Sequence, residues 1–292
     1  MIPAVGGAKH PVLGNSTEDQ THRLKNLGDC FAWARSKIGR RDSERLLEYA
    51  LGTTTSQLYT NPSLDVTTES AKYLSGLVSR RSSGEPVEYI IEECYFWTQK
   101  LQITSDVLIP RPETEILVES ALQFLKDGDR VLDLGTGSGA IALALSSELN
   151  LKVVATDIDL NALNLSRENI DQLGFDIELV QSDWYSSIKG VFDVIVSNPP
   201  YVAIGDPLLT KSGLRYEPLV ALASDKNGLE ALETVIFGST KYLEDGGSLL
   251  VEHGFNQRDQ VMSMFNTAGF LNISCRNDFS DVPRVVFGQK GE

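Results

Sequence analysis

Residues 130–139 read RVLDLGTGSG, an apolar run that passes directly into a glycine-rich turn. The residues that follow, 140–145, are apolar helix formers, so the stretch predicts a buried strand, a sharp turn and a helix. Glycine at three alternate positions lets the backbone turn tightly and leaves room for a ligand beside it. The G-x-G-x-G spacing is not the dinucleotide fingerprint G-x-G-x-x-G, and a turn that serves packing alone is the alternative.

A second predicted strand, residues 152–157, ends in Asp157, 22 positions after Gly135. An acid at the tip of this strand suits the two hydroxyls of a ribose, whereas capping of the next helix is the alternative for Asp157 or Asp159. A third strand, residues 177–180, leads to Trp184, whose ring could cover an adenine face or complete the core. Since no phosphate-binding lysine motif is present, the pattern favours S-adenosylmethionine over ATP.

A fourth predicted strand, residues 192–196, delivers Asn198-Pro199-Pro200-Tyr201, called the tetrapeptide below. The two prolines end the strand because neither can donate a ladder hydrogen bond. The Asn198 side-chain carbonyl and a backbone carbonyl beside the prolines could accept both hydrogens of a planar NH2 group and orient its lone pair. Tyr201 could pack over that group. A plain proline turn with asparagine as a turn former is the alternative.

The order of these patterns predicts an α/β chain in four parts. Residues 1–20 are a loose tail, 21–84 a small helical domain, 85–108 a β-hairpin linker and 109–292 the ligand-binding domain. Within the linker, residues 89–91, 94–97 and 101–103 are all β-prone.

Three single residues are candidates for specific roles. Thr114 is expected to cap the helix that begins after it. Arg111, between two prolines, is either a solvated loop residue or part of a pocket rim. His253, at the end of the strand 248–252, is either a general base or, more commonly for such a residue, structural. The last segments, 270–273 and 284–287, suit the antiparallel end of a mixed sheet.

Composition restricts the class of protein. The 292 residues are 41% hydrophobic and 23% charged, with a net charge of −14, of which −13 falls in residues 109–292. Acidic character argues against tracking along a nucleic-acid backbone. Three cysteines far apart in sequence suit a reducing compartment and no metal site, and no apolar run approaches the roughly 20 residues that cross a bilayer. We expect a monomeric cytoplasmic protein that binds neither membranes nor, directly, nucleic acid.

The chain resembles the HemK/PrmC-like family of protein-glutamine N-methyltransferases over nearly its whole length. The residues that carry the resemblance are Gly84-x-Pro86-x-x-Tyr89-Ile90, Leu108–Glu115, Asp133–Leu143, Ser182-Asp183-Trp184, the tetrapeptide, Glu217-Pro218 and Glu252-His253-Gly254. The Pro-Arg-Pro-Glu-Thr-Glu segment, 110–115, together with the tetrapeptide is the most specific part. Glu92 departs from the family, which usually has glycine there, and this puts the local turn of the hairpin in doubt.

The resemblance implies a seven-stranded Rossmann-like S-adenosylmethionine-dependent methyltransferase domain, with the helical domain and hairpin helping to dock the substrate. It implies methyl transfer to the glutamine of the Gly-Gly-Gln motif in peptide-chain release factors. Asn198, Pro199 and Tyr201 would be catalytic, and these three with Pro200 would hold the glutamine. The implied cofactor-binding residues are Gly135, Thr136, Gly137, Ser138, Gly139, Asp157, Trp184 and Asn198. An adenine-N6 methyltransferase shares the tetrapeptide and is one alternative; a non-catalytic docking protein is the other.

Overall fold

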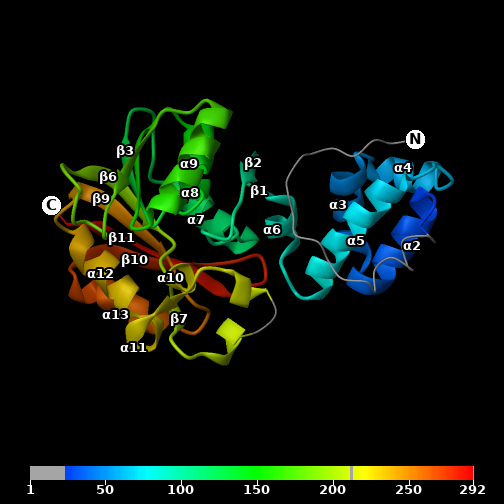
Figure 1. Ribbon diagram of the computed structural model, residues 1–292. Helices are drawn as coiled ribbons and strands as arrows, with labels where there is room; N and C mark the ends of the chain where they lie inside the picture. The colour runs from blue at the N-terminus through cyan, green and yellow to red at the C-terminus, as the bar shows by residue number, and fades with distance from the viewer. Residues whose placement is uncertain (1–23, 211–212, 292) are drawn as a thin grey trace. The chain divides into compact units, whose positions relative to one another are not determined.

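The computed structural model describes residues 24–210 and 213–291, so the predicted tail at residues 1–20 lies outside the described part. The chain divides into two compact units, residues 1–92 (unit 1) and 93–292 (unit 2) (Figure 1). In the described residues no helix is both long and apolar enough to cross a membrane.

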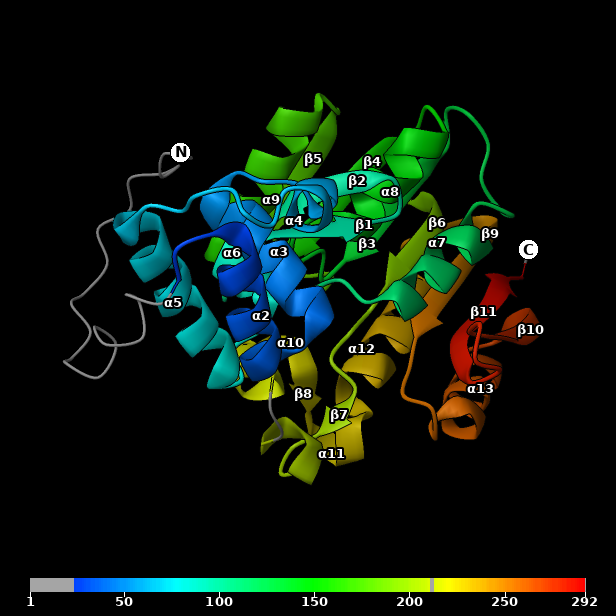
Figure 2. The same cartoon turned by 90° about the vertical axis from the view of Figure 1, so that its right-hand side faces the viewer.

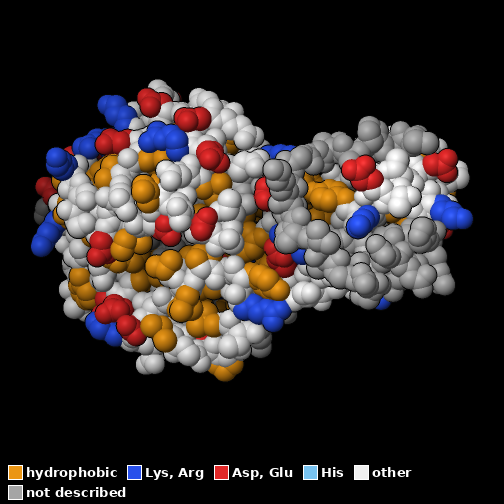
Figure 3. All heavy atoms as spheres, in the orientation of Figure 1, with side chains coloured by type: hydrophobic (Ala, Val, Ile, Leu, Met, Phe, Trp, Pro, Cys, Tyr) orange, Lys and Arg blue, Asp and Glu red, His pale blue; other side chains and the backbone are white. Residues whose placement is uncertain are grey.

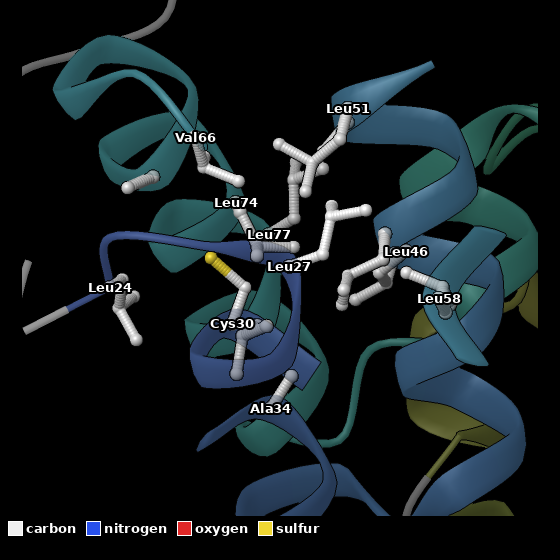
Figure 4. Close-up of a cluster of buried hydrophobic side chains, with 14 of the residues drawn as sticks. Leu24, Leu27, Cys30, Ala34, Leu46, Leu51, Leu58, Val66, Leu74 and Leu77 are labelled. Carbon is white, nitrogen blue, oxygen red and sulfur yellow. The ribbon is translucent and has the colours of Figure 1, made fainter. Parts of the chain in front are cut away.

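Unit 1 is helical, as the apolar spacing predicts. Its helices pack around a core in which Leu27, Leu46, Leu47 and Leu74 are fully buried, and Figure 4 shows such side chains converging from several helices. Burial of each such side chain contributes roughly 1.5–3 kcal/mol. The helices are α2 (Leu27–Ile38), α3 (Arg40–Leu51), α4 (Thr55–Thr60), α5 (Thr68–Ser82) and α6 (Val87–Ile91).

The prediction of a β-prone segment at residues 89–91 is wrong, because these residues form the end of helix α6. Pro86 precedes the helix with φ −56°, which suits a helix start, and Val87, Ile90 and Ile91 bury one face in the core of unit 1. Tertiary packing therefore outweighs the β preference of the isoleucines. The helix ends at Glu92, which adopts a left-handed conformation with φ 59° and ψ 26°. Glycine adopts a left-handed conformation most easily. Glu92 therefore occupies a backbone position that favours glycine, at the end of helix α6.

Unit 2 opens with the hairpin β1 (Glu93–Phe96) and β2 (Gln99–Gln102), and its centre is a seven-stranded sheet in the order β10-β11-β9-β6-β3-β4-β5. The five strands from β9 to β5 are parallel, and β11 and β10 add an antiparallel end, as predicted. The sheet strands are β3 (Arg130–Leu134), β4 (Lys152–Asp157), β5 (Ile177–Gln181), β6 (Phe192–Ser197), β9 (Leu243–Glu252), β10 (Phe270–Asn277) and β11 (Pro283–Lys290).

Helices cover both faces of this sheet, with α7, α8 and α9 on one side and α12 and α13 on the other (Figures 1 and 2). The prediction of a seven-stranded Rossmann-like domain is thereby confirmed. The helices of unit 2 are η1 (Pro112–Thr114), α7 (Glu115–Ala121), α8 (Ala140–Glu148), α9 (Leu160–Leu173), η2 (Pro207–Thr210), η3 (Leu214–Tyr216), α10 (Leu219–Leu222), α11 (Asp225–Gly228), α12 (Glu230–Ser239) and α13 (Arg258–Thr267). A short parallel pair, β7 (Val202–Ala203) and β8 (Ala223–Ser224), lies outside the main sheet.

The parallel strands β4, β3, β6 and β9 end at one edge of the sheet, and each is followed there by residues that the sequence singled out. The glycine-rich loop follows β3, the tetrapeptide follows β6, Asp157 ends β4 and Glu252 ends β9. Ligands of open α/β sheets bind beyond the carboxyl ends of the strands, so this edge is where a site is expected.

Candidate active site

A cavity of about 530 Å³ lies at this edge of unit 2. Many of the predicted site residues line it: Gly135, Thr136, Gly137, Ser138, Asp157, Trp184, Asn198 and Pro200. Three other predicted residues, Gly139, Pro199 and Tyr201, are not among the described residues that line it. The cavity therefore brings the glycine-rich loop and part of the tetrapeptide together from strands that are distant in sequence.

The glycine-rich loop is fixed by backbone hydrogen bonds, since the Gly135 and Thr136 N–H groups both donate to the Thr156 carbonyl, at 2.9 and 2.8 Å. Gly135 has φ 74°, and a Cβ at this position would meet no atom within 4 Å, so open space lies beside it. At Gly139, by contrast, a Cβ would lie 2.6 Å from the Ser166 Oγ atom of α9. The ligand interpretation therefore suits Gly135, and the packing interpretation suits Gly139.

Two backbone hydrogen bonds fix the carboxyl group of Asp157 beside the glycine-rich loop. Its Oδ2 atom accepts a hydrogen bond from the Gly137 N–H at 2.9 Å, and its Oδ1 atom accepts one from the Asp159 N–H at 3.0 Å. An ionised carboxylate has about four acceptor positions, so two remain for hydroxyl donors. Asp159 caps helix α9 by accepting from the Asn161 N–H at 2.8 Å, which settles the alternative between the two acids.

Two large apolar side chains also line the cavity. Trp184 is half-buried and has φ 47°, and Ile158 is 52% exposed. They offer apolar surface to a flat ligand such as a nucleobase. The sequence analysis identified Trp184 but missed Ile158. The available signal was an apolar residue between Asp157 and Asp159 at the end of β4.

Asp133, at the end of β3, is fully buried directly behind the loop. Its Oδ2 atom accepts from the Thr136 hydroxyl at 2.7 Å, while its Oδ1 atom has no hydrogen-bond partner among the described residues. Burial raises the pKa of Asp133 to about 7. Asp133 itself is not among the described residues that line the cavity.

The remaining lining residues are mainly acidic or apolar. Six carboxylates line the cavity and, among its described lining residues, no lysine, arginine or histidine does. Figure 3 shows acidic, basic and hydrophobic side chains interspersed on one face of unit 2. This lining suits a cationic nucleoside and does not suit a phosphate group. The carboxylates are Asp106, Asp157, Asp159, Asp183, Asp225 and Glu230.

In the tetrapeptide, one hydrogen bond to Thr114 orients the side-chain amide of Asn198. Its Nδ2 atom donates to the Thr114 hydroxyl at 3.2 Å, whereas neither its Oδ1 atom nor the Pro199 carbonyl accepts a hydrogen bond from any described residue. The Tyr201 carbonyl is occupied, because it accepts from the Gln257 Nε2 atom at 3.0 Å. The prediction that Thr114 caps the next helix is wrong, since its hydroxyl makes no cap hydrogen bond and serves Asn198 instead.

Tyr201 does not lie over the cavity. Its hydroxyl donates to the Glu252 Oε1 atom at 3.0 Å. Glu252 is 1% exposed, and burial raises the pKa of its carboxyl to about 6, although the Thr114 and Tyr201 hydroxyls lower it. Arg111 forms an ion pair with the buried carboxyl group of Glu217; its own side chain is 33% exposed, and it is not among the described residues that line the cavity.

His253 is buried and does not line the cavity. Its Nδ1 atom lies 2.8 Å from the Gly254 carbonyl, its Nε2 atom lies 3.8 Å from the Cys275 thiol, and burial lowers the pKa of its ring. His253 is therefore a structural residue. Within residues 24–210 and 213–291, no cluster of three or more histidine, cysteine or acidic side chains could hold a metal ion.

Comparison with known proteins gives two family matches along the chain. Residues 24–91 match the model described as PrmC N-terminal domain, and residues 100–209 match the one described as Methyltransferase small domain. The first match covers the helices of unit 1, and the second runs from β2 past the tetrapeptide.

Two relatives that match most of the chain carry the same description. "Release factor glutamine methyltransferase" of Buchnera aphidicola subsp. Acyrthosiphon pisum is 43% identical over 85% of this chain and 91% of its own length. The protein of the same description from Escherichia coli K12 is 39% identical over 87% of this chain and 93% of its own. Among solved structures, a methyltransferase from Pyrococcus furiosus has a TM-score of 0.52 at 21% identity, covering 66% of this chain and 89% of its own, which supports the fold.

Proposed function

The chain belongs to the release factor glutamine methyltransferases, and on that premise we propose that it methylates the side-chain amide nitrogen of the glutamine in the Gly-Gly-Gln motif of peptide-chain release factors. S-adenosylmethionine is the methyl donor. The observation that carries the proposal is the orientation of Asn198, whose Nδ2 atom is anchored on Thr114 while its Oδ1 atom is left as an acceptor at the cavity.

The cavity fits S-adenosylmethionine in shape and charge. When bound, this cofactor supplies an electrophilic methyl group on a positively charged sulfur. Gly135, Thr136, Gly137 and Ser138 would cradle it in the open space beside the loop, with Asp157 accepting from its ribose hydroxyls. Trp184 would cover its base, and the carboxylates that line the cavity would favour the cationic end. Gly139 supports this cradle by allowing α8 and α9 to approach.

The tetrapeptide would hold the substrate amide. Asn198 Oδ1 and the Pro199 carbonyl are two acceptors without a described partner, and they would accept the two hydrogens of a glutamine NH2 group; of these two residues, only Asn198 lines the cavity. An amide nitrogen is a poor nucleophile because its lone pair is delocalised. Two fixed acceptors would orient that lone pair and stabilise the positive charge that develops on nitrogen. Pro200 forms part of the wall, and Tyr201 holds the turn through its hydroxyl rather than covering the amide.

No strong general base is assigned to the reaction. His253 is buried away from the cavity, and the amide proton would pass to solvent after transfer. We further propose that unit 1 and the hairpin help to dock the release factor, and that the protein works as a cytoplasmic monomer, since translation factors act in that compartment.

Labelled-methyl transfer from S-adenosylmethionine to purified release factor tests the proposal. The wild-type factor is compared with a factor whose motif is changed from Gly-Gly-Gln to Gly-Gly-Glu. We expect label on the wild-type factor only. Equal label on both would move the target away from this glutamine, and label on nucleic acid alone would favour the adenine-N6 alternative. Cofactor binding without transfer to any of these would favour a docking protein.

A further inference from the structure

Asn169 is a buried side chain of helix α9 that the reaction described above does not use. It is 1% exposed, and its amide makes three hydrogen bonds, all of them to backbone atoms of unit 2. Its Oδ1 atom accepts from the Gln102 N–H at 2.7 Å. Its Nδ2 atom donates to the Gln102 carbonyl at 3.1 Å and to the Ser138 carbonyl at 2.9 Å. One amide therefore joins two segments that are distant in sequence.

The Asn169 amide has one orientation that satisfies these contacts. An asparagine side chain carries two donor hydrogens and a carbonyl oxygen, so both hydrogens and the oxygen are used here. Turning the amide over would place its NH2 group against the Gln102 N–H and its oxygen against two carbonyls. Buried polar groups that lose their partners cost stability, so the observed orientation is strongly preferred. Asn169 is therefore a fixed connection between the two segments.

The first of these segments is the glycine-rich loop. Ser138 lines the cavity and lies between Gly137 and Gly139, which have φ values of 56° and 85°. Two flanking glycines leave a backbone free to rotate unless other contacts hold it. Asp157 holds the Gly137 N–H, and Asn169 holds the Ser138 carbonyl. The shape of the loop thus depends on Asn169, which is not among the described residues that line the cavity.

The second segment, residues 103–110, forms another part of the cavity wall. It begins directly after Gln102, the last residue of β2, and β2 lies beside α9 (Figures 1 and 2). A Cβ atom at Gly137 would lie 4.0 Å from the Val107 Cβ atom, so this segment packs against the glycine-rich loop. Because Gln102 is bound through both its N–H and its carbonyl, Asn169 fixes where the segment starts. Its residues that line the cavity are Asp106, Val107, Leu108 and Pro110.

We propose that Asn169 is a positioning residue for the cofactor, which holds two walls of the cavity in place: the glycine-rich loop through Ser138, and residues 103–110 through Gln102. This inference rests on the proposed function for the identity of the cofactor. A cavity that already has its binding shape binds more tightly, because less backbone must be ordered when the ligand arrives. Since Asn169 does not line the cavity, its effect passes through these two backbone segments.

The test uses the full-length protein in three variants. Asn169→Leu keeps the outline of the side chain without its hydrogen bonds. Asn169→Asp, when ionised, keeps an acceptor for the Gln102 N–H but has no hydrogen to donate to either carbonyl. Ile170→Ala is the matched control, because Ile170 is the next residue of α9, is also 1% exposed and is not among the described lining residues. It removes buried atoms from the same helix and leaves the three hydrogen bonds in place.

Calorimetric titration with S-adenosylmethionine, in the absence of release factor, gives the cofactor Kd. We expect Kd to rise roughly tenfold or more in both Asn169 variants and to stay within about twofold of wild type in Ile170→Ala. Urea unfolding should show that all three variants are less stable than wild type, so loss of stability alone cannot produce this pattern. An unchanged Kd in both Asn169 variants would overturn the proposal, as would an equal rise in Ile170→Ala.

Hydrogen exchange of the cofactor-free protein provides a second measurement that depends on neither binding nor activity. The N–H groups of residues 135–139 and 99–103 should exchange faster in Asn169→Leu than in Ile170→Ala. Equal exchange in these two variants would contradict the role of the three hydrogen bonds. If Asn169→Leu fails to fold, Asn169→Asp decides both measurements. A wild-type protein that binds cofactor but methylates no release factor would overturn the proposed substrate, whereas the changes in Kd and exchange would still support the role of Asn169.

Discussion

Gly228 lies so close to Tyr201 that a Cβ atom on residue 228 would stand 2.2 Å from the Tyr201 carbonyl oxygen. Gln257 joins the two, because its Nε2 atom donates to the carbonyls of both Tyr201 and Gly228, at 3.0 and 3.3 Å. The backbone at Gly228 therefore packs directly against the backbone of the tetrapeptide. Because the Tyr201 carbonyl belongs to the backbone, it cannot move without shifting the tetrapeptide.

Gly228→Ala should therefore lose most of its activity and some stability. The new methyl group must displace the Tyr201 carbonyl, which would shift the tetrapeptide and cost roughly 100-fold in kcat. Gly205→Ala is the matched control, since Gly205 has a similar φ of 86° against 83°, but its Cβ would meet nothing within 4 Å. Both variants bear the strain of a left-handed alanine, roughly 1–2 kcal/mol. Equal kcat values in the two would show that the contact has no role in activity.

Asn198→Ala should abolish turnover while weakening cofactor binding much less. The variant removes the Oδ1 acceptor, and loss of one such group typically costs roughly 100- to 1,000-fold in kcat. The cofactor cradle formed by the glycine-rich loop and Asp157 is untouched. Single-turnover kinetics and calorimetric titration with S-adenosylmethionine measure the two effects separately. A collapse of cofactor affinity equal to that of kcat would mean that Asn198 serves mainly the cofactor.

Asp133→Asn should change how stability depends on pH. Burial raises the pKa of Asp133 from 3.8 to about 7, so its contribution to stability is complete below pH 3.8 and is lost as the pH rises through 7. Asparagine does not titrate. The variant should therefore gain stability relative to wild type across this range, by about 1.4 kcal/mol for each unit of raised pKa. Urea unfolding of the cofactor-free protein at pH 5 and pH 8 measures it; equal differences at the two values would contradict the assignment.

Glu92→Gly should stabilise unit 1. Glu92 holds a left-handed conformation at the end of α6, which costs a residue with a Cβ roughly 1 kcal/mol or more, and glycine avoids most of that cost. We expect a gain of about 0.5–1 kcal/mol in thermal or urea unfolding. Glu92→Ala is the control, because it removes the same charge and keeps the Cβ. A gain in the alanine variant as large as in glycine would attribute the effect to charge instead.

The parts of the site that sequence could predict are those whose signal is local. The strand and glycine loop of residues 130–139 and the proline stop at the tetrapeptide are local patterns, so their elements were found. Thr114 and Asn198 are 84 positions apart, and Tyr201 and Glu252 are 51 apart. Such pairings depend on strand order in the sheet, which no local pattern specifies. Helix α6 was missed for a related reason. Its residues pack into the core of unit 1, and this packing, which no local pattern specifies, outweighed their β preference.

The position of β11 has a consequence for the order in which the protein becomes functional during its own synthesis. Chains emerge amino-terminus first, and the strands β3, β4 and β5 that carry the cofactor loop precede the tetrapeptide. Glu252 ends β9, whose free side is paired by β11, and the His253 N–H donates to the Arg284 carbonyl at 2.9 Å. A nascent chain that has not yet released residues 283–290 therefore lacks the strand that pairs with one side of β9. The strand that carries Glu252 thus gains its second neighbour only when the carboxyl-terminal segment has been synthesised.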